Sequence, residues 1–124
     1  MKILLVEDDE VLLRIMEHRL LLTDEHQVFT ALNGKTARLL AEQHRPDLVI
    51  TDMLMPLCSG GELINFIRQE LKLSAYIIAM STIGFDDFSN EALELGADQF
   101  VAKPFDLNQF VTSVASCLKV AQAS

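Results

Sequence analysis

Residues 2–9 of the chain read KILLVEDD, an apolar run that ends in acidic residues. Short apolar runs bounded by polar residues are typical of buried strands in a parallel sheet. The pattern recurs, and it predicts strands at 2–6, 27–31, 47–51, 76–80 and 99–102. Apolar residues at helical spacing fill the intervals between them. The alternation predicts an α/β fold with a doubly wound, five-stranded parallel sheet and helices on both faces.

Several residues are suited to end or begin the helices. Ser59 and Glu62 have the spacing of a capping box, and Asp106 is a suitable N-cap for the last helix. Gly96 is a suitable C-cap for the fourth helix, which is expected over residues 87–95. In the third helix, the residues predicted by helical spacing to face the core are Leu63, Ile64, Ile67 and Leu71. In the last helix, they are Leu107, Phe110, Val111, Val114, Ala115 and Leu118.

Length and composition exclude several classes of protein. The 124 residues suffice for one domain, expected over 1–124, and half of them are hydrophobic, so a packed core can form. A net charge of −8 argues against direct binding to nucleic acid. Two widely separated cysteines favour a reducing, cytoplasmic setting over a zinc or disulfide framework. Apolar runs are too short for a signal peptide or a membrane span, so we expect no membrane association.

Polar residues follow four of the predicted strands. They are Glu7 and Asp8, Asp52, Ser81 and Lys103. Ligands of open α/β sheets bind at the carboxyl ends of the strands, where these side chains are expected to meet. Clustered carboxylates repel one another, and a hard cation such as Mg²⁺, which also binds phosphate oxygens, relieves that repulsion. Asp52 could then attack phosphorus, with the Lys103 ammonium and the Ser81 hydroxyl on the phosphoryl oxygens.

Each of these residues also has an ordinary explanation when taken alone. The acidic group after the first strand could cap a helix, and Asp9 is well placed to do so. Ser81 could be a turn residue, and Asp52 could belong to a solvated loop. Lys103 precedes Pro104, which cannot continue a strand. Their joint placement at successive strand ends favours a single site.

These residues resemble the receiver domains of two-component response regulators, and the chain is similar to the chemotaxis response regulators. The resemblance covers essentially the whole chain and rests on residues 2–9, residues 46–56, Gly60, Ser81, Gly96-Ala97-Asp98 and Lys103-Pro104-Phe105. It implies the flavodoxin-like (βα)5 fold with strand order 2-1-3-4-5, for which a chemotaxis regulator of this family is the standard example.

The resemblance also implies a role for each site residue. Asp52 would take a phosphoryl group from a sensor histidine kinase or a phosphotransfer protein, with catalysis by Lys103 and Ser81. Mg²⁺ would be held by Asp8 directly, by Glu7 through water, by Asp52, and by the backbone carbonyl of Leu54. Ser81 and Phe100 would form the switch.

The expected protein is thus a signalling switch that catalyses its own phosphorylation and dephosphorylation, and we do not class it as an enzyme. The surface of the fourth helix, fifth strand and fifth helix would control an output protein or domain. A homodimer on phosphorylation is a possible outcome. The last helix carries no arginine, so the salt-bridged dimer face of DNA-binding regulators is not evident in it.

Three other functions remain open at this stage. A phosphatase of the haloacid-dehalogenase type would place its nucleophile after the first strand in a D-x-D pattern, which residues 8–10 lack. A flavin carrier would need a glycine- and hydroxyl-rich phosphate loop where the acidic residues 7–10 stand. A receiver-shaped interaction module that is never phosphorylated is the third alternative, and the intact acid, hydroxyl and lysine set argues against it.

Overall fold

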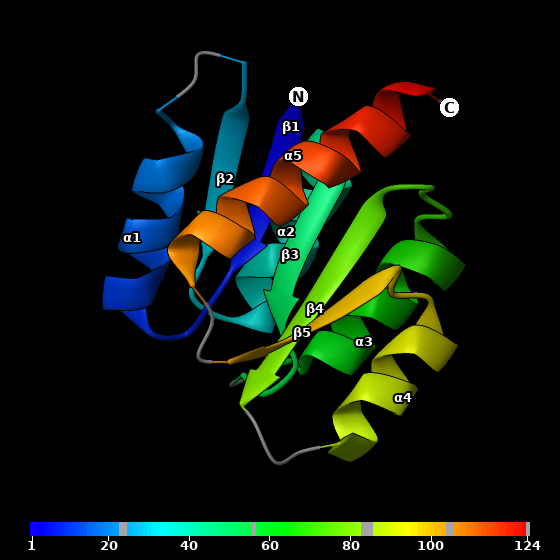
Figure 1. Cartoon of the computed structure of the whole chain (residues 1–124). Helices are drawn as coiled ribbons and strands as arrows, with labels where there is room; N and C mark the ends of the chain where they lie inside the picture. Colours follow the sequence, from blue (N-terminus) through cyan, green and yellow to red (C-terminus); the bar gives the residue numbers. More distant parts are fainter. Residues whose placement is uncertain (23–24, 56, 83–85, 104–105, 124) are drawn as a thin grey trace.

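The computed structural model describes residues 1–22, 25–55, 57–82, 86–103 and 106–123, with the side chains of 82, 86–89 and 118–123 left aside. Strands and helices alternate along the chain (Figure 1). The elements are β1 (Lys2–Val6), α1 (Glu10–Leu20), β2 (Gln27–Ala31), α2 (Gly34–His44), β3 (Leu48–Asp52), α3 (Gly60–Asn65), η1 (Phe66–Glu70), β4 (Tyr76–Thr82), α4 (Asp86–Leu95), β5 (Gln99–Lys103) and α5 (Leu107–Ala123). Pro56, Pro104 and Phe105 of the motifs, and the side chain of Leu118, lie outside this description.

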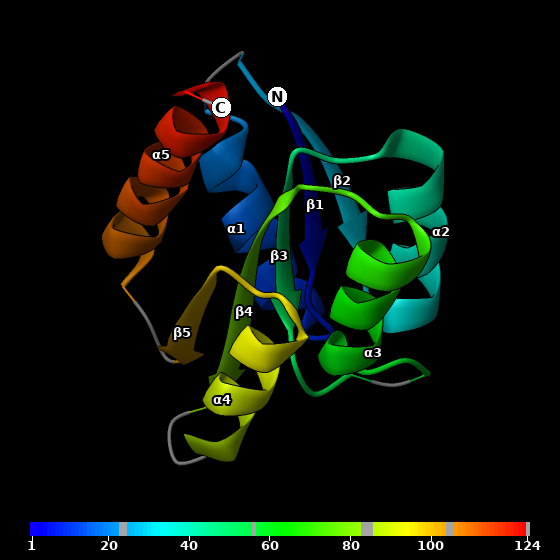
Figure 2. The same ribbon diagram turned by 90° about the vertical axis from the view of Figure 1, so that its right-hand side faces the viewer.

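The five strands form one parallel sheet in the order β2-β1-β3-β4-β5, which confirms the predicted fold and strand order. Helices α1 and α5 cover one face, and α2, α3 and α4 cover the other (Figure 2). Strands β2 and β5 are the two edges of the sheet. Residues 27–30 of β2 are exposed or only partly buried, which fits a strand at the edge of the sheet.

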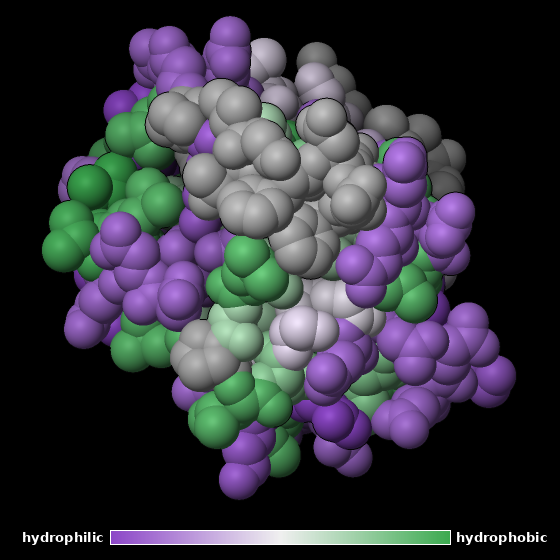
Figure 3. All heavy atoms as spheres, turned by 90° about the horizontal axis from the view of Figure 1, so that it is seen from below, coloured by the Kyte–Doolittle hydropathy of each residue, from purple (hydrophilic) through white to green (hydrophobic). Residues whose placement is uncertain are grey.

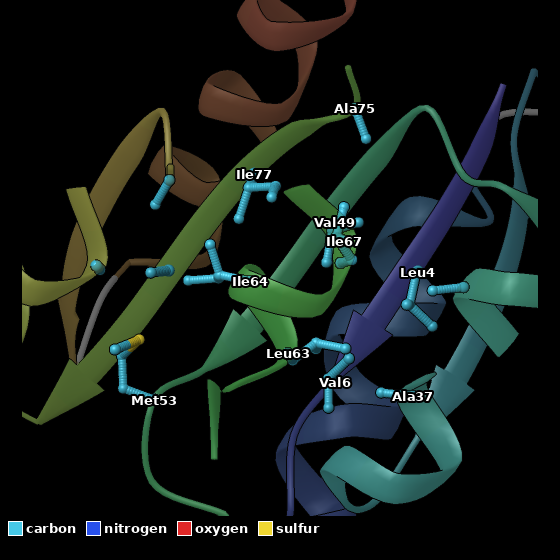
Figure 4. Close-up of a cluster of buried hydrophobic side chains, with 14 of the residues drawn as sticks. Leu4, Val6, Ala37, Val49, Met53, Leu63, Ile64, Ile67, Ala75 and Ile77 are labelled. Carbon is cyan, nitrogen blue, oxygen red and sulfur yellow. The ribbon is translucent and has the colours of Figure 1, made fainter. Parts of the chain in front are cut away.

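Alternation of side chains along the strands divides the core into two clusters, because successive residues of a strand point to opposite faces. Toward α2, α3, η1 and α4, the buried hydrophobic strand residues are Leu4, Val6, Ala31, Val49, Ile77 and Ala79. Figure 4 labels Leu4, Val6, Val49 and Ile77 among them. Toward α1 and α5 they are Ile3, Leu5, Leu48, Ile50, Ile78 and Met80. Strands that are buried on both faces are the reason why the sequence shows continuous apolar runs.

Helix ends follow the predicted capping chemistry. Ser59 Oγ accepts a hydrogen bond from the amide of Glu62 at 3.1 Å, and Asp106 Oδ1 accepts one from Asn108 at 2.7 Å. Asp9 caps α1 by accepting from the amides of Val11 and Leu12. Asp9 is therefore the helix cap that the acidic run was expected to contain, which leaves Glu7 and Asp8 for the strand edge.

Three details differ from the sequence predictions. Asp52, Ser81 and Lys103 belong to the last residues of their strands and do not follow them, because the pairing with the neighbouring strand continues through these residues. The third helix changes to a π-helical turn over Phe66–Glu70, where Leu71 N–H donates to the carbonyl of Phe66, and Leu71 lies beyond it. On α5 the inward face runs through Phe110, Val114 and Cys117, whereas Ala115 is exposed.

Candidate functional site

The carboxyl ends of β1, β3, β4 and β5 meet at one end of the molecule, which Figure 3 views end-on. Hydrophobic and hydrophilic atoms interleave over this end in several separate patches. Glu7, Asp52 and Ser81 are buried there, with exposed fractions of 1, 7 and 1%. Asp8 is exposed to solvent. The four strand ends thus place one set of polar groups at the same edge, with Asp8 in contact with water and Glu7, Asp52 and Ser81 inside the protein.

Lys103 joins two of the strand ends through its ammonium group. Its Nζ donates to Glu7 Oε2 at 2.5 Å and to Asp52 Oδ2 at 2.9 Å. All three side chains are largely shielded from water, with exposed fractions of 16% for Lys103, 2% for Glu7 and 10% for Asp52. Charge-assisted hydrogen bonds of this kind are about twice as strong as neutral ones. The ammonium therefore ties β1, β3 and β5 together at the site.

Burial and neighbouring charges shift the pKa of two groups. Burial raises the pKa of the Glu7 carboxyl, the hydrogen bond from Lys103 works against this, and the charge of Asp52 adds to the increase. Burial alone would lower the pKa of Lys103, but its hydrogen bonds and charge interactions with Glu7 and Asp52 raise the pKa overall. Lys103 is accordingly a cation at neutral pH.

Carboxylate oxygens of Glu7, Asp8 and Asp52 all lie within 4.8 Å of one another. One ammonium offsets only part of the charge of three carboxylates, so the cluster retains an excess of negative charge. Hard divalent cations prefer such oxygen ligands, and the exposed Asp8 leaves a path for them to enter. These residues fit Mg²⁺. Leu54 lies two residues beyond Asp52 with its side chain half exposed, and ligation through its carbonyl stays a prediction.

The two expected switch residues lie on β4 and β5. Ser81 pairs in register with Ala102, next to Lys103, and its buried Oγ has no hydrogen-bond partner within the described part of the chain. A buried hydroxyl without a partner costs free energy, which an incoming acceptor would recover. Phe100 pairs in register with Ala79 and packs, partly buried, against the core beneath α4.

Thr51 and Gly60 hold the main chain around Asp52, and neither residue has a predicted part in the chemistry. Thr51 Oγ1 donates to the carbonyl of Asp52 at 2.9 Å. A Cβ added to Gly60 would lie 2.2 Å from that carbonyl, so only glycine permits this approach. The direct bond from Lys103 to Glu7 was also not foreseen, since the two residues are 96 positions apart and no local pattern links them.

Comparison with known proteins agrees with this geometry. The family model of the response regulator receiver domain matches residues 3–115, and the chain belongs to that family. Members are switches in two-component signalling. The signal receiver domain of a putative Luxo repressor protein from Vibrio parahaemolyticus superposes with a TM-score of 0.89 at 28% identity, over 98% of this chain and 92% of that one. The family assignment speaks against the phosphatase and flavin-carrier alternatives.

Two sequence relatives show the contexts in which such a domain occurs. Histidine kinase P4 of Formosa agariphila is 33% identical over 94% of this chain, which corresponds to 8% of that protein. The probable transcriptional regulator ycf27 of Pyropia yezoensis is 34% identical over 95% of this chain and 47% of that protein. The chain thus spans at most about half the length of these relatives. Among the described residues, no helix is long and apolar enough to cross a membrane.

The ion pairs of Lys103 lead to a prediction on stability. In Lys103→Met, the buried carboxylates of Glu7 and Asp52 lose their counter-charge, and breaking such a pair costs about 3 kcal/mol. Urea unfolding without divalent metal should show this loss in the free energy of unfolding. Lys35→Met, at an exposed lysine of α2, is the control and should stay within about 0.5 kcal/mol of wild type. Equal effects of the two substitutions would show that the Lys103 pairs do not stabilise the fold.

Proposed function

We propose that the chain is a phosphoacceptor domain in which Asp52 takes a phosphoryl group from the phosphohistidine of a sensor histidine kinase or a phosphotransfer protein. The observation that carries this proposal is the surroundings of Asp52. Its shielded carboxylate lies 2.9 Å from a fixed ammonium, and the hydroxyl of Ser81, which has no hydrogen-bond partner among the residues that the structure describes, is buried at the end of the neighbouring strand. Phosphoryl transfer asks a protein mainly for positioning and charge stabilisation, and these groups can provide both.

In the proposed transfer, a carboxylate oxygen of Asp52 forms a bond to phosphorus. The bond from phosphorus to the histidine nitrogen breaks, and its electron pair stays on the imidazole. Lys103, already within hydrogen-bond distance of Asp52, would donate to one phosphoryl oxygen, and Ser81 would donate to another. Lys103 is held against Asp52 before the reaction, so little reorganisation of this donor is needed.

Glu7, Asp8, Asp52 and the carbonyl of Leu54 would hold Mg²⁺, as implied by family membership and by the close approach of the three carboxylates. When bound, the metal would supply positive charge to phosphoryl oxygens. Asp8 is the exposed member of the group, and we expect it to be a direct ligand. Glu7 accepts from Lys103 through Oε2 and from the amide of Asp9 through Oε1, so we expect it to act on the metal through water and not as a direct ligand.

Phosphorylation would change the surface formed by α4, β5 and α5, and this surface would control an output protein or domain. Relatives twice as long as this chain include probable transcriptional regulators, which fits control of a second domain. The phosphoryl group adds about −1.5 to −2 charges at one point. Ser81 and Phe100 would convert this charge into a shift between two arrangements of the surface. A homodimer through this surface is one form that the output could take.

We expect Mg²⁺-dependent phosphorylation of Asp52 by acetyl phosphate without a kinase, because the site itself holds the reacting groups in place. Intact-mass measurement should show one added phosphoryl group on the wild-type chain, and none when the metal is chelated. Asp52→Asn should stay unmodified, while Asp47→Asn, an exposed acid before β3, should react like wild type. Labelling that persists in Asp52→Asn would place the phosphoacceptor elsewhere.

Mg²⁺ should raise the melting temperature of the chain, because a ligand of the folded state stabilises that state by mass action. Asp8→Asn should melt at a higher temperature than wild type in metal-free buffer, since it relieves repulsion among the carboxylates, and it should lose most of the Mg²⁺ response. Thermal melts over a Mg²⁺ titration measure both effects. An unchanged Mg²⁺ response in Asp8→Asn would remove Asp8 from the metal site.

Ser81→Ala should still accept a phosphoryl group but respond to it weakly, because the mutant lacks the hydroxyl proposed to follow the phosphoryl oxygen. NMR of the Phe100 ring with and without acetyl phosphate measures that response. The matched control is Ser74→Ala, which removes an exposed hydroxyl from the loop before β4, at the opposite end of the sheet. Full-sized shifts at Phe100 in phosphorylated Ser81→Ala would exclude Ser81 from the switch.

A further inference from the structure

Far from the phosphoacceptor, Arg68 holds together the turn between α4 and β5. From the π-helical turn η1, its Nε donates to the carbonyl of Gly96 at 3.0 Å and its Nη1 to the carbonyl of Leu73 at 2.8 Å. Its Nη2 donates to Asp98 Oδ2 at 3.0 Å. The Arg68 side chain is 18% exposed, so its bonds to the carbonyls of Gly96 and Leu73 are partly buried, whereas Asp98, with a side chain 40% exposed, accepts its bond at the surface. One guanidinium thus binds the loop before β4, the end of α4 and the residue that precedes β5.

Asp98 carries this restraint into the sheet. Its Oδ2 also accepts a hydrogen bond from the amide of Ile77 at 2.8 Å, and its own amide donates to the carbonyl of Ile77 at 2.8 Å. Asp98 is therefore fixed to β4 by both its side chain and its main chain. The next residue, Gln99, begins β5 opposite Ile78. The starting point of β5 along β4 is set at Asp98.

Gly96 makes room for the arginine. It has φ +120°, a left-handed conformation that favours glycine, and a Cβ added there would lie 2.8 Å from Arg68 Cγ. The glycine that ends α4 and the arginine that binds its carbonyl therefore depend on one another. Gly96 has the residue type and position of a helix cap, but the arginine that it accommodates lies 28 residues earlier in the chain, so no local pattern indicates it.

The register of β5 decides where Lys103 lies. β5 is an edge strand, with β4 as its neighbour in the sheet, and the main-chain ladder alone does not select one register. A slip of one residue would move Lys103 by about 3.3 Å and turn its side chain toward the opposite face. Its 2.9 Å bond to Asp52 could not survive such a slip. Asp98 directly precedes β5, and Lys103 is the last residue of that strand. The extended strand therefore separates the two residues by about 16 Å.

Building on the phosphoacceptor function proposed above, we propose that Arg68 and Asp98 are positioning residues for phosphoryl transfer. They fix the register of β5 and thereby hold the Lys103 ammonium against Asp52. They touch neither the phosphoryl group nor the metal. Their effect on the reaction passes through Lys103.

The first test measures the strand itself and needs no phosphorylation. Arg68→Met and Asp98→Asn should increase amide hydrogen exchange in β5 by about tenfold, because each removes a charge-assisted bond that anchors the strand. The amides of β1 should be unchanged. Arg45→Met is the control, since exposed Arg45 also bonds the main chain near η1, at Leu71, without reaching the turn before β5. Unchanged exchange in β5 of both variants would overturn the proposal.

The second test asks whether the effect passes through Lys103. With acetyl phosphate and Mg²⁺, Arg68→Met should be phosphorylated about tenfold more slowly than wild type, with Arg68→Lys in between. In a Lys103→Met background, Arg68→Met should slow the reaction no further, whereas a merely structural role would slow it equally in both backgrounds. Equal slowing in both backgrounds would overturn the proposal. If Arg68→Met fails to fold, Asp98→Asn is compared in the wild-type and Lys103→Met backgrounds in the same way.

Failure of the phosphoacceptor function can be told apart from failure of the positioning role. If wild type accepts no phosphoryl group, the function proposed for Asp52 is wrong, and the state of Lys103 is then read from the ¹⁵N NMR signal of its ammonium. Arg68→Met should shift that signal while Arg45→Met leaves it in place. A Lys103 signal that is the same in all three proteins would overturn the positioning role.

Discussion

One ammonium group holds the functional edge of this molecule together. Lys103 donates to Glu7 at the end of β1 and to Asp52 at the end of β3, and all three groups are largely shielded from water. Removing Lys103 would leave two carboxylates inside the protein without their counter-charge, which is far costlier than losing a surface ion pair. In the proposed function, phosphoryl transfer to Asp52 would use the same charges that stabilise this edge. Stability and the proposed chemistry would then depend on one contact.

The rest of the fold serves to bring distant parts of the chain to that contact. A parallel sheet aligns the ends of strands that are far apart in sequence, and two layers of helices bury the strands on both faces. Gly60 lets the segment after β3 approach the carbonyl of Asp52, and Gly96 leaves space for Arg68 beside the start of β5. Strand β5 lies at the edge of the sheet and has β4 as its neighbour on one side. Its placement therefore needs more support from side-chain contacts than that of an inner strand.

Local patterns in the sequence predicted what local interactions decide. Apolar runs located the strands to within two residues, the largest difference being at the end of β4, and Ser59 and Asp106 cap their helices as expected. The π-helical turn was not predictable, because an apolar pattern such as that of residues 63–71 does not distinguish it from a regular helix. The bonds of Lys103 to Glu7 and of Arg68 to Asp98 join residues far apart in sequence, so only the folded chain reveals them. Strand order came from family resemblance alone.

The central claim is that the strand ends form one phosphoryl-binding site around Asp52. A crystal structure with Mg²⁺ and beryllofluoride, a mimic of the phosphoryl group, tests it most directly. We expect beryllium on a carboxylate oxygen of Asp52, with Lys103 Nζ and Ser81 Oγ as donors to its fluorides and the metal beside Asp8. Beryllofluoride bound elsewhere, or a Ser81 hydroxyl still without a partner beside an occupied Asp52, would contradict the account.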